Sequence, residues 1–330
     1  MLTLLRKKPT LREIKAPIAE EMKAFDRHFR KSIASKVPLL DKITYYIASR
    51  KGKQMRPMFV IFCAKLCGQV TEGTYNAATA VELGHTSTLV HDDVIDDANE
   101  RRGFFSIKAL WKNKIAVIVG DYLVSRCFML AIKNKEYRLL DFMAEAMEQI
   151  MEGELLQMEK ARRLDIDEGV YYEIIKGKTA SLIALACAAG TASVTADEAM
   201  IENARLLGEK IGMAFQIKDD LFDYGTNDVG KPLGNDIKEK KMTLPLIYAL
   251  DKAPKSTKRK IIKIIKRNNN QPEKVKEVID FVKDSGGLEY ATSIMYQYRQ
   301  EAFEVLDKFP PSEVRTALRD LITYVTERKK

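Results

Sequence analysis

The sequence predicts an all-α protein, and three observations support this. Proline, the strongest helix breaker, is absent between Pro57 and Pro232. Alanine, leucine, isoleucine, methionine, lysine and glutamate dominate that stretch, and most of them favour helices. No Asn-Gly or Asp-Gly pair joins alternating apolar runs, so hairpin signals are weak. Because 46% of the 330 residues are apolar, the chain can bury a sizeable core, and we expect one helical domain over residues 1–330.

Helical periodicity extends from about Pro57 to Tyr224, and short breaks are expected at 68–73, 97–106, 133–138, 164–169 and 190–196. Within the last break, Thr195 followed by Ala-Asp-Glu has the order of a helix cap and an acidic first turn. The glycine-rich, polar stretch 225–241 is expected to be an active-site loop. Later helices are expected at 244–250, 257–266, 272–285, 288–308 and 312–328.

The net charge of +9 favours anionic partners. Nucleic acid is not expected among them, since the chain has no zinc-finger spacing and no RNA-binding aromatic signature. The cysteines lack a metal-type CxxC pair and are expected to be reduced core residues: Cys63, Cys67, Cys127 and Cys187. The N-terminal segment lacks the apolar region of a signal peptide, and we find no apolar run of membrane-spanning length. We therefore expect a soluble, cytoplasmic protein.

Two aspartate clusters with the same internal spacing lie far apart in helix-like surroundings. They are Asp92, Asp93 and Asp96, and Asp219, Asp220 and Asp223. Positions i and i+4 share a helix face, so each cluster directs at least two carboxylates the same way. Such carboxylates repel one another and lose solvation near a core, and a divalent cation would relieve both problems. Mg²⁺ suits them because it takes carboxylate oxygens and completes its shell with water and substrate phosphates. Two clusters facing each other would clamp a diphosphate.

Basic residues suited to phosphate accompany both clusters. Arg101 and Arg102 follow the first cluster, and Lys53 and Arg56 lie in a basic turn before the proline-free body. Around the second cluster the polar residues are Lys178, Thr179, Gln216, Lys231, Asp236 and Lys241. No conventional nucleophile stands out among these residues, so the pattern indicates diphosphate chemistry driven by charge placement.

With these motifs the chain resembles the trans-prenyl diphosphate synthase (polyprenyl synthetase) family, and most of all its medium- and long-chain members. The matching segments follow the family order: Gly52-Lys-Gln-Met-Arg-Pro57, His91-Asp-Asp-Val-Ile-Asp96 with Arg101-Arg-Gly103, Gly177-Lys-Thr179, Phe215-Gln-Ile-Lys-Asp-Asp-Leu-Phe-Asp223, and Gly230-Lys-Pro-Leu-Gly-Asn-Asp236 with Lys241. The resemblance implies a single large helical bundle of the isoprenoid synthase type with a central cavity. It also implies a homodimer.

The resemblance also implies a role for each motif residue. Asp92, Asp96 and Asp219 would be direct ligands of about three Mg²⁺ ions per active site, and Asp93, Asp220 and Asp223 would assist through water or neighbouring contacts. Arg101, Lys178 and Lys231 would hold an allylic diphosphate (farnesyl or geranyl), and Lys53, Arg56, His85 and Arg102 would hold isopentenyl diphosphate. Thr179 and Gln216 would face the reacting carbons, and Lys241 would complete the set of substrate-binding residues. His91 has no implied role.

The implied reaction is ionisation of the allylic C–O bond, attack on the carbocation by the isopentenyl double bond, and loss of a proton. Bulky aromatics one turn before the first cluster shorten the product in this family. Here Ser87 and Thr88 occupy that turn, with Gly84 one turn further back. We therefore expect a product longer than farnesyl, about heptaprenyl to octaprenyl. Phe128 on the neighbouring helix would then close the tunnel.

Several alternatives remain. The chain could make geranylgeranyl diphosphate, or serve as a non-catalytic subunit of a heteromeric synthase, although such subunits tend to lose motif residues. A class I terpene cyclase is disfavoured, since its second metal motif normally mixes Asn or Asp with Ser or Thr and Glu. The basic segment 255–267 has two interpretations. The first, a solvated helix that covers the core, is favoured over the second by about two to one. The other interpretation is a helix that touches a membrane surface transiently and assists product release.

Overall fold

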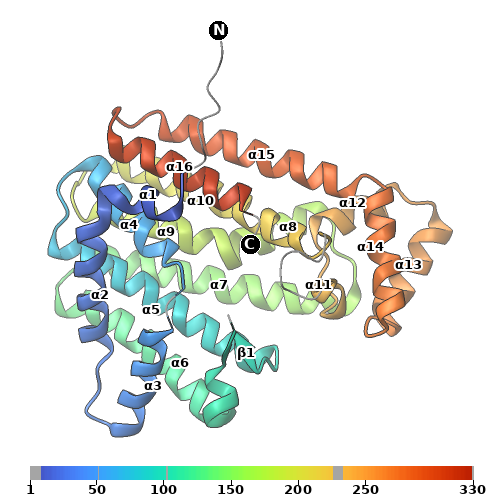
Figure 1. Cartoon of the computed structure of the whole chain (residues 1–330), viewed down its shortest axis with the longest axis horizontal. Helices are drawn as coiled ribbons and strands as arrows, with labels where there is room; N and C mark the ends of the chain where they lie inside the picture. The colour runs from blue at the N-terminus through green and yellow to red at the C-terminus, as the bar shows by residue number, and fades with distance from the viewer. Residues whose placement is uncertain (1–8, 51, 102, 226–232, 329–330) are drawn as a thin grey trace. The chain divides into compact units, whose positions relative to one another are not determined.

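The computed structural model describes residues 9–50, 52–101, 103–225 and 233–328, and these residues are almost entirely helical (Figure 1). The helices are α1 (Leu11–Lys15), α2 (Ala19–Ile33), α3 (Pro38–Ser49), α4 (Met55–Cys67), α5 (Glu72–Ile95), α6 (Ile107–Lys133), α7 (Tyr137–Arg163), α8 (Glu168–Ile175), α9 (Ser181–Ala192), α10 (Glu198–Phe222), α11 (Asn235–Lys238), α12 (Leu244–Lys252), α13 (Lys255–Arg267), α14 (Pro272–Asp284), α15 (Gly287–Leu306) and α16 (Glu313–Glu327). A 3₁₀ turn, η1 (Ala16–Ile18), follows α1, and a π-helical turn, η2 (Lys176–Ala180), lies between α8 and α9. The prediction of an all-α protein is confirmed.

The helix boundaries fall within the five predicted breaks or up to two residues outside them, and the later helices begin and end within about three residues of prediction. Two details differ. A short antiparallel hairpin, β1 (Glu100–Arg101) and β2 (Phe104–Phe105), occupies the break before α6. At α10 the capping residue is Asp197 and not Thr195, because the Asp197 carboxylate accepts the amides of Ala199 and Met200 at 2.9 and 3.2 Å. The Thr195 hydroxyl instead accepts the amide of Asp197 at 3.2 Å.

Contacts within the chain group its residues into two compact units. The first unit draws on residues 1–147, 182–205 and 306–320, and the second on residues 148–181, 206–305 and 321–330. Each unit is therefore assembled from separated stretches of sequence. The single domain expected over residues 1–330 stays a prediction.

In the first unit α5 packs along α6 and also contacts α4 and α2 (Figure 1). Its N-terminus is fixed by a reciprocal cap: the Thr71 hydroxyl accepts the amide of Thr74, and the Thr74 hydroxyl accepts the amide of Thr71 at 3.1 Å. α4 is buried from Pro57 to Ala64. α9 approaches α4 closely at Gly190, where a side chain would collide with the carbonyl group of Val60. The C-terminal half of α5 carries the first aspartate cluster.

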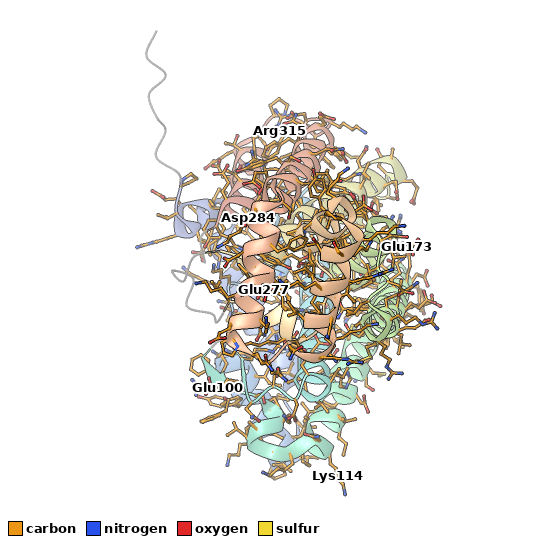
Figure 2. All side chains as sticks on the ribbon, turned by 90° about the vertical axis from the view of Figure 1, so that its right-hand side faces the viewer. Glu100, Lys114, Glu173, Glu277, Asp284 and Arg315 are labelled. Atoms are coloured by element: carbon orange, nitrogen blue, oxygen red, sulfur yellow. The ribbon has the colours of Figure 1, made fainter. Side chains whose placement is uncertain are left out.

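In the second unit a core of aliphatic and tyrosine side chains joins the C-terminal half of α10 to α8, α12, α13 and α14. Tyr224 is fully buried there, and its hydroxyl lies 2.6 Å from that of Thr243. Ile261, Ile264 and Ile265 of α13 enter this core, so the apolar face of the basic helix covers the protein interior. Figure 2 looks onto α14, where Glu277 accepts an ion pair from Lys260 of α13 at 2.6 Å. The covering-helix interpretation of 255–267 agrees with this packing.

Among the described residues, two helical stretches, 107–133 and 168–192, are long and apolar enough to span a membrane by length and composition alone. The sequence-based statement that no apolar run reaches this length was therefore wrong. It missed α6 because Asp121 and Arg126 interrupt the apolar residues from Ile115 to Ile132. The stretch 168–192 is mostly buried, whereas only 33% of the apolar window of α6 is buried. Much of α6 is thus an exposed apolar surface.

The close approach of α9 to α4 leads to a stability prediction. We expect Gly190→Ala to lower the free energy of unfolding by about 1–3 kcal/mol, since two backbones would have to separate around the new methyl group. Thermal and urea unfolding followed by circular dichroism would measure the change. The control is Gly169→Ala, at an exposed position in the first turn of α8. Equal stability of the two variants would contradict the argument.

Candidate functional site

The first aspartate cluster lies at the C-terminal end of α5. Asp92 and Asp93 belong to its last turn, and Asp96 is the capping residue that ends it. Asp93 is buried, Asp92 is partly buried and Asp96 is exposed. The geometry thus separates one interior carboxylate from two that are more accessible to ions and substrate.

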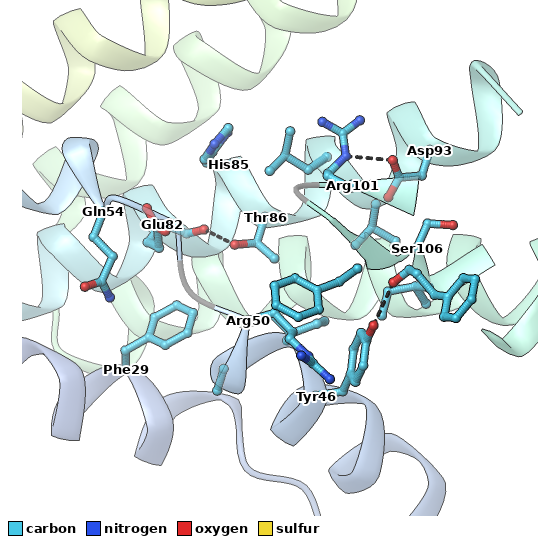
Figure 3. A pocket seen from close by; sticks show the side chains of 18 residues that line it. Phe29, Tyr46, Arg50, Gln54, Glu82, His85, Thr86, Asp93, Arg101 and Ser106 are labelled. Carbon is cyan, nitrogen blue, oxygen red and sulfur yellow. Dashed lines mark hydrogen bonds and ion pairs between the residues drawn. The ribbon is translucent and has the colours of Figure 1, made fainter. Parts of the chain in front are cut away.

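Asp93 is held by an arginine of the hairpin. Arg101 Nε donates to Asp93 Oδ1 at 2.6 Å, as Figure 3 shows. Burial raises the pKa of Asp93, and the hydrogen bond and positive charge of Arg101 offset part of that rise. Arg101 was expected to bind diphosphate, and the structure adds that it also anchors the first cluster. Arg102, the second expected arginine, lies outside the described residues.

An aromatic clamp holds the hairpin against α3 (Figure 3). The guanidinium of Arg50 lies 4.0 Å from the ring centre of Phe104 and 5.0 Å from that of Tyr46. The Tyr46 hydroxyl donates to the carbonyl of Phe105 at 2.8 Å. Cation–π contacts and this hydrogen bond thus fix both ends of strand β2, and through it the position of Arg101.

A pocket of about 120 Å³ opens beside the clamp. It is lined by His85, Asp93 and Arg101, together with Gly52 and Gln54 on either side of Lys53 (Figure 3). Arg56 Nη1 donates to His85 Nε2 at 2.9 Å, which joins two residues expected to bind isopentenyl diphosphate. The exposed side chain of Lys53 lies in the loop before α4. Most of the basic residues predicted around the first cluster are therefore neighbours.

His91, for which the sequence gave no role, binds α5 to α6. Its Nε2 atom lies 3.3 Å from Asp121 Oδ1 and 3.4 Å from the carbonyl of Val117. Gly120 is required at this point, because any side chain there would overlap the imidazole ring. His91 thereby fixes the turn of α5 that carries Asp92.

The second aspartate cluster belongs to a hydrogen-bonded chain in the second unit. The Thr179 hydroxyl donates to Gln216 Oε1 at 2.7 Å, and Gln216 Nε2 donates to Asp220 Oδ1 at 2.8 Å. The hydroxyl of Tyr171 donates to the other oxygen of Asp220 at 2.7 Å. Thr179 and Gln216 were predicted to act together, whereas Tyr171 was missed. Its only sequence signal is its position in an apolar helix about two turns before Lys178.

Lys178 and Thr179 lie on the π-helical turn η2, a distortion that recurs at functional sites. Gly153 and Gly177 allow α7 to approach this turn, since side chains there would meet backbone atoms of the other segment. Lys178 forms an ion pair with Glu154 of α7, which the sequence did not reveal as a site residue. The π-helical turn thus carries Lys178 and Thr179 at adjacent positions.

The chain after α10 folds back onto Asp223. Its carboxylate accepts the amides of Asn235 and Asp236 at 2.7 and 3.1 Å, and its carbonyl accepts the amide of Gly234. The predicted active-site loop is therefore fixed to the cluster at its described end. Lys231 lies outside the described residues, and Lys241 forms an ion pair with Glu239.

A pocket of about 150 Å³ gathers the predicted residues of this unit. Its polar lining includes Lys178, Thr179, Gln216, Asp219, Asp220, Lys241, Tyr171 and Asp236. Burial, with smaller contributions from neighbouring carboxylates, raises the pKa of Asp220 to about 7 and that of Asp236 to about 8. Asp236 had been noted as a loop residue, and the structure makes it part of the site.

Asp219 is the one carboxylate of this cluster for which a guanidinium partner is seen among the described residues. Arg328 Nη2, directly after α16, donates to Asp219 Oδ1 at 2.9 Å. Asp220 and Asp223 instead accept bonds from neutral groups. Arg328 lies 109 positions from Asp219, so nothing in the local sequence pattern indicated the pair.

The residues present fit a divalent cation. Buried carboxylates with raised pKa values are crowded together at the second cluster, and a cation would stabilise their charged forms. Among residues 9–50, 52–101, 103–225 and 233–328, no three carboxylate, imidazole or thiol side chains already surround a metal position. Water or phosphate oxygens would therefore have to complete the coordination, as Mg²⁺ generally requires.

Among the residues expected to set product length, Gly84, Ser87 and Thr88 lie along α5 and Phe128 lies on α6. Ser87 is fully buried and donates to the carbonyl of Gly84 at 2.8 Å, and Thr88 donates to that of His85. A side chain at Gly84 would meet Met143 Cε at 3.1 Å and Met147 Sδ at 3.8 Å. Phe128 of α6 is partly buried. Met143 and Met147 of α7 thus lie beside Gly84, one of the residues expected to set product length.

A helical fold with two Asp-Asp-x-x-Asp motifs and basic phosphate-type residues defines an enzyme of the isoprenoid synthase class. The polyprenyl synthetase family profile matches residues 37–282. The chain belongs to the polyprenyl synthetase family, whose members are prenyltransferases.

The chain is similar to several members of the family over nearly its whole length. It is 34% identical to an all-trans-nonaprenyl-diphosphate synthase (geranyl-diphosphate specific) of Rhodobacter capsulatus, covering 96% of this chain and 97% of that one. A polyprenyl synthase of Caulobacter crescentus complexed with calcium and isoprenyl diphosphate has a TM-score of 0.91 at 31% identity, covering 98% and 100%. A geranylgeranyl pyrophosphate synthase of Bacteroides thetaiotaomicron has a TM-score of 0.82 at 38% identity, covering 96% and 98%. The isoprenoid synthase fold and a divalent-metal requirement agree with these likenesses.

The carboxylates of the second cluster predict a pH dependence for the metal-free protein. The unfolded pKa of aspartate is about 3.9, whereas Asp220 titrates at about 7 and Asp236 at about 8 in the folded chain. Their contribution to stability is full below the unfolded value and is lost as pH rises through the folded values. We therefore expect the Tm in EDTA to fall from about pH 4 to about pH 8 and to level off above that range.

Asp220→Asn should flatten that fall, and added Mg²⁺ should raise the Tm of the native sequence at the upper end of the range. Asp165→Asn, an exposed aspartate of the same unit, is the control and should leave the profile unchanged. A Tm that stays level in EDTA, or an identical profile for Asp220→Asn, would contradict the argument.

Proposed function

We propose that this chain catalyses the head-to-tail condensation of isopentenyl diphosphate onto an allylic diphosphate, farnesyl or geranyl, as an all-trans polyprenyl diphosphate synthase. The observation that carries the proposal is the completeness of the site. Both aspartate clusters are intact, and each has basic residues beside it. A non-catalytic subunit would not need to preserve them, which disfavours that alternative.

Different residues of the chain would bind the two substrates and the metal ions. Arg56 and His85, with Lys53 and Arg102, hold isopentenyl diphosphate, while Arg101, Lys178 and Lys231 hold the allylic diphosphate. About three bound Mg²⁺ ions would neutralise charge on the leaving diphosphate. Asp92, Asp96 and Asp219 are the proposed direct ligands, as the family resemblance implies, and Asp93, Asp220 and Asp223 are held by hydrogen bonds within the chain. The oxygens of Thr179 and Gln216 face positive charge developing on the substrate carbons.

The proposed product is longer than farnesyl and about heptaprenyl to octaprenyl in length. Small residues at Gly84, Ser87 and Thr88 support it. A geranylgeranyl product is the alternative, and the 38% identity to the Bacteroides thetaiotaomicron geranylgeranyl pyrophosphate synthase favours it. Met143 and Met147, which lie against Gly84, would then end the growing chain in place of Phe128.

The central test is an assay of product length. Purified protein with Mg²⁺, labelled isopentenyl diphosphate and farnesyl diphosphate should give a ladder ending near seven or eight units, as the small residues predict. Asp92→Asn and Asp219→Asn should each lower kcat by about 100-fold or more, because each removes a proposed metal ligand. Loss of only a few-fold would contradict the metal assignments, and no condensation with any allylic starter would favour the subunit alternative.

Two variants then locate the end of the tunnel. Phe128→Ala should lengthen the product if Phe128 closes it, and Met143→Ala should do so if the α7 methionines close it. The variant that lengthens the product identifies the residue.

We also propose a homodimer that covers α6. Five large apolar side chains of this helix are 39–62% exposed: Leu110, Val117, Ile118, Met129 and Ile132. A surface of this kind on a soluble helix is typical of an association face, and a second copy is the partner that the family resemblance implies. Membrane contact would use the exposed lysines of α13 electrostatically, since Ile261, Ile264 and Ile265 are buried. A cytoplasmic location is part of the proposal.

The dimer proposal predicts that Ile118→Glu, at the most exposed of these positions, converts the protein to a monomer at micromolar concentration, because it places a charge in an apolar interface. Light scattering after size exclusion would measure the mass. Lys114→Glu, an exposed charge change on the same helix, is the control and should leave the dimer intact. A native monomer would overturn the proposal.

A further inference from the structure

Arg328 forms an ion pair with Asp219, a proposed metal ligand of the second cluster. Its Nη2 atom donates to Asp219 Oδ1 at 2.9 Å, while the Arg328 side chain is only 16% exposed and that of Asp219 is 43% exposed. A partly buried, charge-assisted contact of this kind is stronger than an exposed ion pair. Since the Asp219 side chain is nearly half exposed, an ion arriving from solvent can still reach it.

Arg328 is also held independently of Asp219. Its guanidinium lies 4.5 Å from the ring centre of Phe215 and 5.3 Å from that of Phe222. Phe215, Asp219 and Phe222 have the i, i+4, i+7 spacing of one face of α10. The arginine therefore lies along that face, with an aromatic ring on either side of the carboxylate. Losing the carboxylate would still leave both ring contacts.

The residues of α16 that precede Arg328 are fixed as well. Leu321, Ile322, Val325 and Thr326 are buried in the last turns of α16. Glu327, the residue before Arg328, pairs with Arg299 of α15 at 2.7 Å. The buried Nε of Arg328 has no hydrogen-bond partner within the described part of the chain. The position of the Arg328 side chain is thus set by α16 and by the contacts with the two aromatic rings. Its hydrogen-bonding capacity is not fully used.

We infer that Arg328 is the resident counter-ion of Asp219 and competes with the metal ion for this carboxylate. It stabilises the metal-free site by neutralising a motif aspartate, and it raises the metal concentration needed to load the second cluster. When a metal ion takes Asp219, the two rings keep the guanidinium at the edge of the site. Arg328 is then a positioning residue that controls metal loading.

The inference rests on the proposed role of Asp219 as a direct ligand, so the test measures metal binding without turnover. Mn²⁺ binding to the substrate-free, full-length protein is followed by electron paramagnetic resonance. We expect Arg328→Gln to bind Mn²⁺ about fivefold more tightly than the native chain, the effect of removing one moderately strong competing ion pair. Arg328→Lys keeps the charge and should stay near the native affinity.

The matched control is Arg319→Gln on the same helix. Arg319 pairs with Asp307, which belongs to neither aspartate cluster, and the change should leave Mn²⁺ affinity unaltered. In an Asp219→Asn background, Arg328→Gln should have no further effect, because the contested carboxylate is gone. Unchanged or weaker Mn²⁺ binding by folded Arg328→Gln would overturn the inference. Failure of the native chain to condense any substrate would instead count against the proposed function.

Discussion

The repulsion between carboxylates near an apolar core is the constraint on which the rest of this structure depends. Each aspartate cluster must keep several negative charges close together, yet burial opposes their ionisation. The protein satisfies the inner carboxylates with its own donors: Arg101 for Asp93, Tyr171 and Gln216 for Asp220, and loop amides for Asp223. The remaining carboxylates are left more accessible. Carboxylates with a structural role and carboxylates proposed to bind metal thus lie within one short motif.

Close helix packing supplies the second requirement, which is positional accuracy. Gly153 and Gly177 bring α7 against the π-helical turn, and Gly120 makes room for His91 between α5 and α6. In each case a glycine lets a backbone approach a residue beside the chemistry. The aromatic clamp at Arg50 serves the same purpose with side chains, since it fixes the hairpin that carries Arg101. The residues proposed to bind substrate are thus supported by rigid elements and not by loops alone.

Local patterns in the sequence predicted the all-α class, most helix boundaries and the motif residues, because these depend on nearby spacing. Several failures concern interactions that join distant parts of the chain. Tyr171 lies 49 positions from Asp220, and Glu154 becomes a partner of Lys178 only through the packing of α7 on the π-helical turn. Thr195 was predicted to cap α10, but Asp197 caps it, because the Asp197 carboxylate accepts two backbone amides. The apolar length of α6 was hidden by two interspersed charges at Asp121 and Arg126.

The methionines beside Gly84 have a consequence for the precision of the product. A thioether side chain has three rotatable bonds and adapts its shape to what it contacts. A growing chain that reached Met143 and Met147 would meet a boundary made of several interconverting rotamers, whereas an aromatic ring would present a single fixed wall. Chain growth against such a boundary would stop over a range of lengths. The enzyme would then release a mixture of neighbouring homologues whose proportions shift with temperature.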